Sequence, residues 1–292
     1  MNWFEHLAEK LTATMETPGN YGWFHIMMLC IMVLFTVVIC AVGKNWSDKT
    51  FRRFILACWI INVIGEAYVA LAFSFQNVDG VAHWDYAWYM FPFQLCSSPA
   101  YTLPFIAFLK EGKVRDAFIS FNCTFAFFGG LAVMIYPNDV FMWITGINIQ
   151  TMIHHGLQMA LGIFMMIYRR RRLTHRYFLR GIYVFTVLVL IAMVLNIGVY
   201  HIFQGLGMDD TFNMYYISPY FHCTLPVLSI VWDLVPYPVF LAIYIFGFSL
   251  VAALMYYIQR AFILKATGIA PHTLKVNYER PISSKTRAKI NE

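Results

Sequence analysis

Seven long apolar stretches, separated by short polar or charged segments, dominate the sequence. They cover residues 24–43, 54–75, 88–109, 117–136, 143–168, 182–203 and 236–258. An α-helix of about 20 residues crosses the ~30 Å hydrocarbon core of a bilayer, and each stretch reaches that length. The pattern therefore predicts an all-α polytopic membrane protein, a bundle of seven transmembrane helices.

Basic residues predict the orientation of this bundle. Nearly all of the 21 lysines and arginines fall in four clusters, at residues 44–53, 110–115, 169–180 and 260–289. With seven spans these clusters all lie on one side of the membrane, so the positive-inside rule places the N-terminus outside and the C-terminus inside.

The same pattern divides the chain into three parts. Residues 1–22 form an outer interfacial segment, because apolar residues recur there at the spacing of a short amphipathic helix. Residues 23–260 form the seven-helix transmembrane domain. Residues 261–292 form a basic cytoplasmic tail, which we expect to be attracted to anionic lipid.

Composition supports a membrane protein and narrows the possible partners. The chain is 60% hydrophobic and only 12% charged, whereas soluble domains carry about a quarter charged residues. The net charge of +6 comes from clusters at the helix ends, so we expect no nucleic-acid partner. Six cysteines without a Cys-x-x-Cys pair fit neither a disulfide framework nor a structural zinc site. We expect a multi-pass protein of the plasma membrane.

A few polar residues lie within the predicted spans, and ionisable groups at membrane depth are site candidates because burying them is costly. Counted from the outer helix ends at 1.5 Å per residue, they fall in one layer in the outer half of the membrane. The layer contains Asn62 and Glu66 of the second span, Gln94 and Cys96 of the third, Gln150, His154 and His155 of the fifth, and Asn196 of the sixth. The layer predicts a site buried between helices.

Cys96 is the candidate nucleophile of this site. A thiol beside an imidazole can lose its proton, and the thiolate attacks an ester carbonyl without a metal. The candidate catalytic residues are Cys96, His155 and His154, with Glu66, Gln94, Gln150 and Asn196 as supporting residues. Spacing does not decide which histidine is the base. Adjacent histidines point in different directions and lack the i, i+4 spacing of zinc ligands, so we expect no metal, and no cofactor is implied.

Two readings compete with an enzyme. Polar groups at mid-depth also bind small ligands in carriers and receptors. Alternatively, the layer could consist of interhelical hydrogen bonds that hold a structural protein together.

Several motifs resemble one family. These are Phe91–Ser97 (FPFQLCS), Ile149–Leu157 (IQTMIHHGL) and a later series, Tyr215-Tyr216, Ser218-Pro219, Leu228-Ser229, Trp232-Asp233 and Val235–Pro238. Over about residues 20–260, the chain resembles the YwaF family of bacterial integral membrane proteins and its eukaryotic relatives, the transmembrane-protein-164 acyltransferases. The resemblance implies a seven-helix enzyme that moves a fatty acyl chain between phospholipid and lysophospholipid through a cysteine thioester. It maps the nucleophile onto Cys96 and the base onto His155.

Two features depart from the family pattern. Gln94 stands where many members have histidine, and the loop between Pro219 and Trp232 is longer than usual. That loop belongs to the long outer segment 204–235, and connections of this length usually carry function or cover a site.

Overall fold

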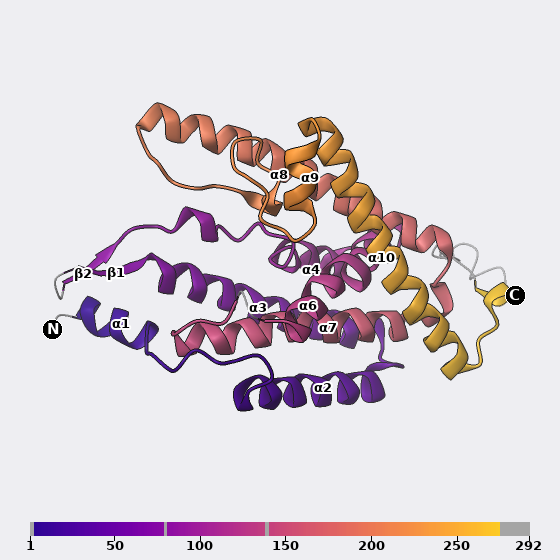
Figure 1. Ribbon diagram of the computed structural model, residues 1–292. Helices are drawn as coiled ribbons and strands as arrows, with labels where there is room; N and C mark the ends of the chain where they lie inside the picture. The colour runs from indigo at the N-terminus through magenta and orange to yellow at the C-terminus, as the bar shows by residue number, and fades with distance from the viewer. Residues whose placement is uncertain (1–2, 79–80, 138–139, 275–292) are drawn as a thin grey trace, which may run out of the picture.

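The computed structural model describes residues 3–78, 81–137 and 140–274, and the chain is predominantly helical there (Figure 1). Its elements, in chain order, are α1 (Trp3–Leu11), α2 (Trp23–Gly43), α3 (Asp48–Ser74), β1 (Phe75–Val78), β2 (Val81–Trp84), η1 (Trp88–Met90), α4 (Pro99–Phe108), α5 (Lys113–Phe121), the π-helical turn η2 (Asn122–Ala126), α6 (Phe127–Ile135), α7 (Thr145–Tyr168), η3 (Arg170–Arg172), α8 (His175–Leu206), η4 (Met214–Tyr216), α9 (Leu228–Leu234), α10 (Tyr237–Thr267) and η5 (Pro271–Thr273). The strands β1 and β2 form one antiparallel hairpin that the apolar pattern did not predict.

Among the described residues, five helices are long and apolar enough to cross a membrane: α2, α3, the continuous helix 113–135 formed by α5, η2 and α6, α8 and α10. They match five of the seven predicted spans, so the chain is a multi-pass membrane protein. The helix α7 is also continuous, over 24 residues. It is not among the five because polar residues interrupt its apolar sequence. The count of seven and the orientation of the termini remain predictions.

The prediction of a continuous span over residues 88–109 is wrong. This stretch contains the short turn η1, an irregular segment and the ten-residue helix α4. Pro92 and Pro99 explain the break, because proline lacks the N–H that an interior helical hydrogen bond needs and disfavours a helical conformation at the residue before it. Pro99 instead begins α4, where a missing N–H costs nothing. Cys96 therefore lies in a turn rather than on a helix.

The helix α7 lies at the centre of the bundle. It packs against α2, α3, α6 and α10, and most of its residues from Thr151 onward are buried. Small residues permit this close packing: a Cβ on Gly130 of α6 would lie 2.6 Å from the carbonyl oxygen of His155, and one on Gly156 would lie 2.5 Å from Met32 of α2. Figure 1 shows α2 and α8 along opposite edges, with α3, α6 and α7 between them.

Charged residues from four helices meet at one end of the bundle. Arg115, whose side chain is fully buried, donates to Asp48 at 2.7 Å and to Glu111 at 2.8 Å. Glu111 also accepts two hydrogen bonds from Arg169. Burial alone would raise the pKa of Glu111, but Arg169 and the neighbouring guanidinium groups outweigh it and hold this pKa below its ordinary value. Glu111 therefore stays ionised at neutral pH.

A second carboxylate, Asp116, completes this ion-pair network. Its fully buried side chain lies 3.9 Å from Arg169 and 3.7 Å from both Arg172 and Arg180. Arg260 of α10 reaches the same end and donates to the carbonyl oxygen of Leu173. Arg52 of the first cluster pairs with Asp48, so all four basic clusters of the sequence contribute residues to one end of the bundle. The basic residues after residue 274 lie outside the described residues.

The segment between α8 and α9 folds back into the bundle. Its buried residues are Phe212, Asn213, Met214, Tyr215, Ile217, Ser218 and Cys223. Tyr215 and Tyr216 both have φ values in the left-handed region, 58° and 56°. A non-glycine residue in this region is uncommon, and surrounding contacts have to hold it there.

The first described element of the chain is α1, the short helix predicted within residues 1–22. It lies beside the β1–β2 hairpin, as Figure 1 shows. Its place at a membrane interface and the division into three parts remain predictions, and most of the basic tail 261–292 lies outside the described residues.

Candidate active site

Cys96 lies in a turn between η1 and α4, with its side chain partly buried. The backbone N–H of Ser97 donates to the carbonyl of Gln94 at 3.0 Å, and that of Ser98 donates to Leu95 at 3.3 Å. These bonds define the turn that replaces the predicted helix. A turn can expose a side chain and its own backbone groups to contacts that a regular helix would block.

Two residues of α7 hold the carbonyl oxygen of Cys96. The Nε2 atom of His154 donates to this oxygen at 2.8 Å, and the Nε2 atom of Gln158 donates at 2.5 Å. Residues four apart on a helix share one face, which is why both side chains reach the same atom. The spacing of His154 and Gln158 was visible in the sequence, but the acceptor was not.

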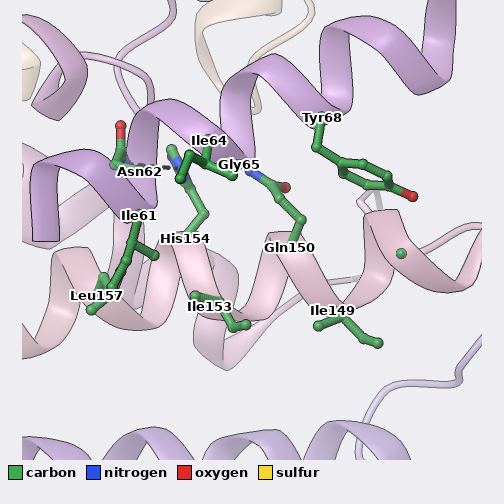
Figure 2. A pocket seen from close by; sticks show the side chains of 11 residues that line it. Ile61, Asn62, Ile64, Gly65, Tyr68, Ile149, Gln150, Ile153, His154 and Leu157 are labelled. Atoms are coloured by element: carbon green, nitrogen blue, oxygen red, sulfur yellow. Dashed lines mark hydrogen bonds between the residues drawn. The ribbon is translucent and has the colours of Figure 1, made fainter. Parts of the chain in front are cut away.

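The second ring nitrogen of His154 is also engaged. Its Nδ1 atom lies 3.1 Å from Nδ2 of Asn62 and 3.6 Å from Oε1 of Glu66, both on α3. Since Nε2 must carry a proton to donate to a carbonyl, Nδ1 of the neutral ring accepts from the Asn62 amide. Figure 2 shows this contact between α3 and α7. His154 thus links α3 to the Cys96 turn.

His155 has a different hydrogen-bonding state. Its Nδ1 atom lies 2.8 Å from the carbonyl oxygen of Thr151, so Nδ1 carries the proton and donates. In the neutral ring Nε2 is then unprotonated and able to accept a proton. The side chain is 7% exposed, which shields it from solvent. The sulfur of Cys96 and one ring nitrogen from each of His154 and His155 all lie within 4.8 Å of one another.

The same three side chains are possible metal ligands within the described part of the chain. Both nitrogens of His154 already make hydrogen bonds, to Cys96 and to Asn62. To hold a metal together with His155, His154 would have to release one of these partners. The hydrogen-bonding pattern favours proton transfer between thiol and imidazole over metal coordination.

Two predicted supporting residues, Gln94 and Asn196, bind the segment that folds back from α8. Gln94 donates to the carbonyl of Asn213 at 3.0 Å and accepts from the N–H of Tyr215 at 2.7 Å. Asn196 makes a similar pair of bonds with the backbone of Met214, at 2.9 and 2.7 Å. Both side chains thus bind backbone groups at the start of η4. They border the site rather than entering it.

Tyr215 also belongs to this region, although the sequence analysis named it only as part of a family motif and not as a site residue. Its backbone binds Gln94, and its hydroxyl group lies 2.6 Å from the hydroxyl group of Ser98. Tyr215 therefore contacts the Cys96 turn both before Cys96, at Gln94, and after it, at Ser98. Its carbonyl accepts from Tyr244 of α10. Nothing in the local sequence shows that a loop tyrosine more than a hundred residues away would reach the turn.

The remaining predicted residues, Glu66 and Gln150, lie on the α3 and α7 side of the site. Glu66 is 14% exposed and close to His154. Gln150 lines a groove between α3 and α7 whose walls also include Asn62 and His154 (Figure 2). The structure thus brings Cys96, both histidines and Glu66 together and places Gln150 one helical turn before His154.

Comparison with known proteins adds a family to this geometry. The model of the TMEM164 family matches residues 20–258, a range that contains all of the candidate site residues. No curated protein and no solved structure gives a significant match. Because the family model covers more than half of the sequence, the chain belongs to the TMEM164 family.

Proposed function

We propose that the chain is a membrane-embedded acyltransferase or acyl hydrolase that carries a fatty acyl group of a phospholipid as a thioester on Cys96. The observation that carries the proposal is a cysteine sulfur within 4.8 Å of two histidine rings, one of which has a nitrogen free to accept a proton. Interhelical hydrogen bonding alone does not require a thiol at this point. Family membership is consistent with the proposal.

In the first half-reaction, the proton of the Cys96 thiol moves to Nε2 of His155. The thiolate attacks the ester carbonyl carbon, and the C–S bond forms as the carbonyl oxygen becomes an oxyanion. Collapse of this intermediate breaks the bond to the glycerol oxygen, which takes the proton back from His155 and leaves as the hydroxyl of a lysophospholipid. General acid–base transfer of this kind contributes typically 10²–10⁴-fold to the rate.

Other residues support these steps. The carbonyl of Thr151 accepts from Nδ1 of His155, so it fixes the ring and stabilises its protonated form. His154 and Gln158 hold the Cys96 backbone, and Glu66 lies beside His154. In this assignment His155 is the base and His154 is a positioning residue.

In the second half-reaction, a hydroxyl group attacks the thioester carbonyl while His155 takes its proton, the C–S bond breaks, and the thiolate regains the proton. A lysophospholipid hydroxyl makes the protein a transferase, whereas water makes it a hydrolase. We place the protein in the plasma membrane and in a YwaF-like branch of its family, on the charge pattern and on the motif around Cys96.

The decisive test is the intact mass of the purified protein after incubation with mixed phospholipids. We expect an adduct with the mass of a fatty acyl group that hydroxylamine removes, since hydroxylamine cleaves thioesters. The Cys96→Ala variant should show no adduct, while Cys123→Ala, which removes a fully buried cysteine, should keep it. Analysis of the adduct mass identifies the preferred chain.

An adduct that persists in Cys96→Ala would contradict the nucleophile assignment. If neither protein carries an adduct and the lipids remain unchanged, the alternative is favoured: a carrier or receptor that binds a small ligand in the same polar layer. In that case ligand-dependent stabilisation should be equal in the wild type and in Cys96→Ser.

Tyr215→Phe should slow formation of the thioester about tenfold without unfolding the protein. The variant keeps the buried ring and the backbone bond to Gln94 but removes the hydroxyl contact with Ser98. Loss of a hydrogen bond with a buried partner costs about 1–3 kcal/mol, and 1.4 kcal/mol corresponds to a factor of ten in rate. Single-turnover kinetics measure the effect. Tyr256→Phe, which removes a hydroxyl bonded to Thr174 at the other end of the bundle, is the control and should react at the wild-type rate.

A further inference from the structure

A groove of about 310 Å³ runs along the outside of the bundle between α3 and α7. Figure 2 shows its walls: Ile61, Asn62 and Tyr68 belong to α3, while Gln150 and His154 belong to α7. Apart from four polar side chains, the lining consists of aliphatic residues and glycines. From Gly146 to Leu157 the groove follows α7 for about 16 Å at 1.5 Å per residue.

Two glycines keep the two helices close at the floor of the groove. A Cβ on Gly65 would lie 3.3 Å from the side chain of Gln150, and one on Gly146 would lie 2.0 Å from the hydroxyl of Tyr68. Gln150 and Tyr68 therefore lie flat against the opposite helix. The Tyr68 hydroxyl donates to the carbonyl of Leu11, which fixes the ring. The groove is thus a consequence of defined packing rather than of a missing side chain.

The walls of the groove face hydrocarbon. The helix α3 is long and apolar enough to cross a membrane, and Ile64 and Ile149 on its rim are 64% and 40% exposed. Lipid chains are the apolar groups available at this surface. The groove is about half as long as the ~30 Å hydrocarbon core is thick. Half of that thickness is the space that an acyl chain of one leaflet occupies.

One polar position in the groove distinguishes it from an ordinary lipid-facing surface. Gln150 lies in its middle, and its amide has no hydrogen-bond partner among the described residues. An amide in this position can donate to an ester carbonyl. His154, one helical turn further along α7, borders the groove and donates to the carbonyl of Cys96. The groove therefore shares His154 with the candidate active site.

We propose that this groove binds one acyl chain of a glycerophospholipid, with the chain against the isoleucines of α3 and α7 and its ester near Gln150 and His154. This assignment rests on the proposed function, because it places the ester that Cys96 would attack. The lipid would then enter the protein laterally from the bilayer, between α3 and α7.

Photolabelling tests the groove without requiring catalysis. Full-length Cys96→Ala protein is reconstituted in bilayers with a phosphatidylcholine that carries a diazirine on one acyl chain, irradiated, and mapped by peptide mass. We expect labels concentrated on residues 61–68 and 146–157. Ile64→Trp should reduce this labelling at least fivefold because indole fills the groove, and Ile153→Trp provides a second blocking variant.

The matched control is Val194→Trp on α8. Val194 is 65% exposed, close to the 64% exposure of Ile64 in the groove. This substitution should leave the labelling of the groove unchanged. Labels spread evenly over the lipid-facing helices, or equal labelling in Ile64→Trp and wild type, would overturn the proposal. Groove labelling together with the absence of a Cys96 adduct would refute only the acyl-transfer mechanism, whereas an adduct without groove labelling would refute only the groove.

Discussion

His155→Asn is expected to slow formation of the thioester by roughly 10²–10⁴-fold, the usual contribution of a general base. Asparagine keeps a donor near the position of Nδ1, so the bond to the Thr151 carbonyl can persist. It has no nitrogen lone pair to take the thiol proton. Single-turnover kinetics measure the rate of thioester formation in the wild type and the variant.

His154→Asn is the matched control, because the two histidines are adjacent but make different contacts. His154 uses one nitrogen on Cys96 and the other on Asn62, so we expect its loss to displace the Cys96 turn without removing the base. The rate should fall about tenfold, as for the loss of one or two hydrogen bonds. A larger loss in His154→Asn than in His155→Asn would mean that the two roles are reversed.

The depth of each polar residue in its predicted span indicated which residues lie close together, although the span assumed for Cys96 is not a continuous helix. Cys96, His154, His155 and Glu66 lie on three different segments, yet counting residues from the helix ends placed them in one layer, and the structure brings them together. The reason is physical: a charged or hydrogen-bonding group in hydrocarbon has to find a partner at its own depth. Five of the predicted spans also appear as long apolar helices, because crossing the hydrocarbon core requires about 20 apolar residues.

Contacts between distant segments could not be predicted in this way. Gln94 and Asn196 have the correct depth, but the backbone that they bind belongs to a loop far along the chain. Hydropathy does not show that this loop enters the bundle, because its apolar residues are separated by polar and turn-forming ones. The apolar pattern also did not predict the break in the span 88–109, although the prolines there marked its position.

The basic clusters were interpreted only as signals of orientation. The structure shows that several of their members are buried ion-pair partners. The side chain of Arg115 is fully buried, and that of Arg169 is only 7% exposed. Sequence position near a helix end does not separate these arginines from exposed ones. Which arginines are buried depends on Glu111 and Asp116, because their carboxylates make burial of the guanidinium groups possible.

Asp116→Asn should lower the free energy of unfolding by about 3–5 kcal/mol, the cost of removing one charge from a buried ion-pair network. The Asp116 side chain is fully buried, with Arg169, Arg172 and Arg180 within 3.7–3.9 Å. Asparagine has nearly the same shape, so the loss reflects charge rather than packing. Unfolding by denaturant in detergent micelles, followed by circular dichroism, measures the difference.

Asp48→Asn is the control for this prediction, because Asp48 also pairs with arginines but its side chain is 45% exposed. Arg115 keeps its ion pair with Glu111 after this substitution, and the other partner, Arg52, is 27% exposed to water. This variant should therefore lose about 1 kcal/mol or less. Since the two substitutions make the same chemical change, the difference between them isolates burial. Equal, small losses at both positions would show that water reaches the network around Asp116. Equal, large losses would show that the ion pairs on α3 and α5 act as one unit in holding this end of the bundle together.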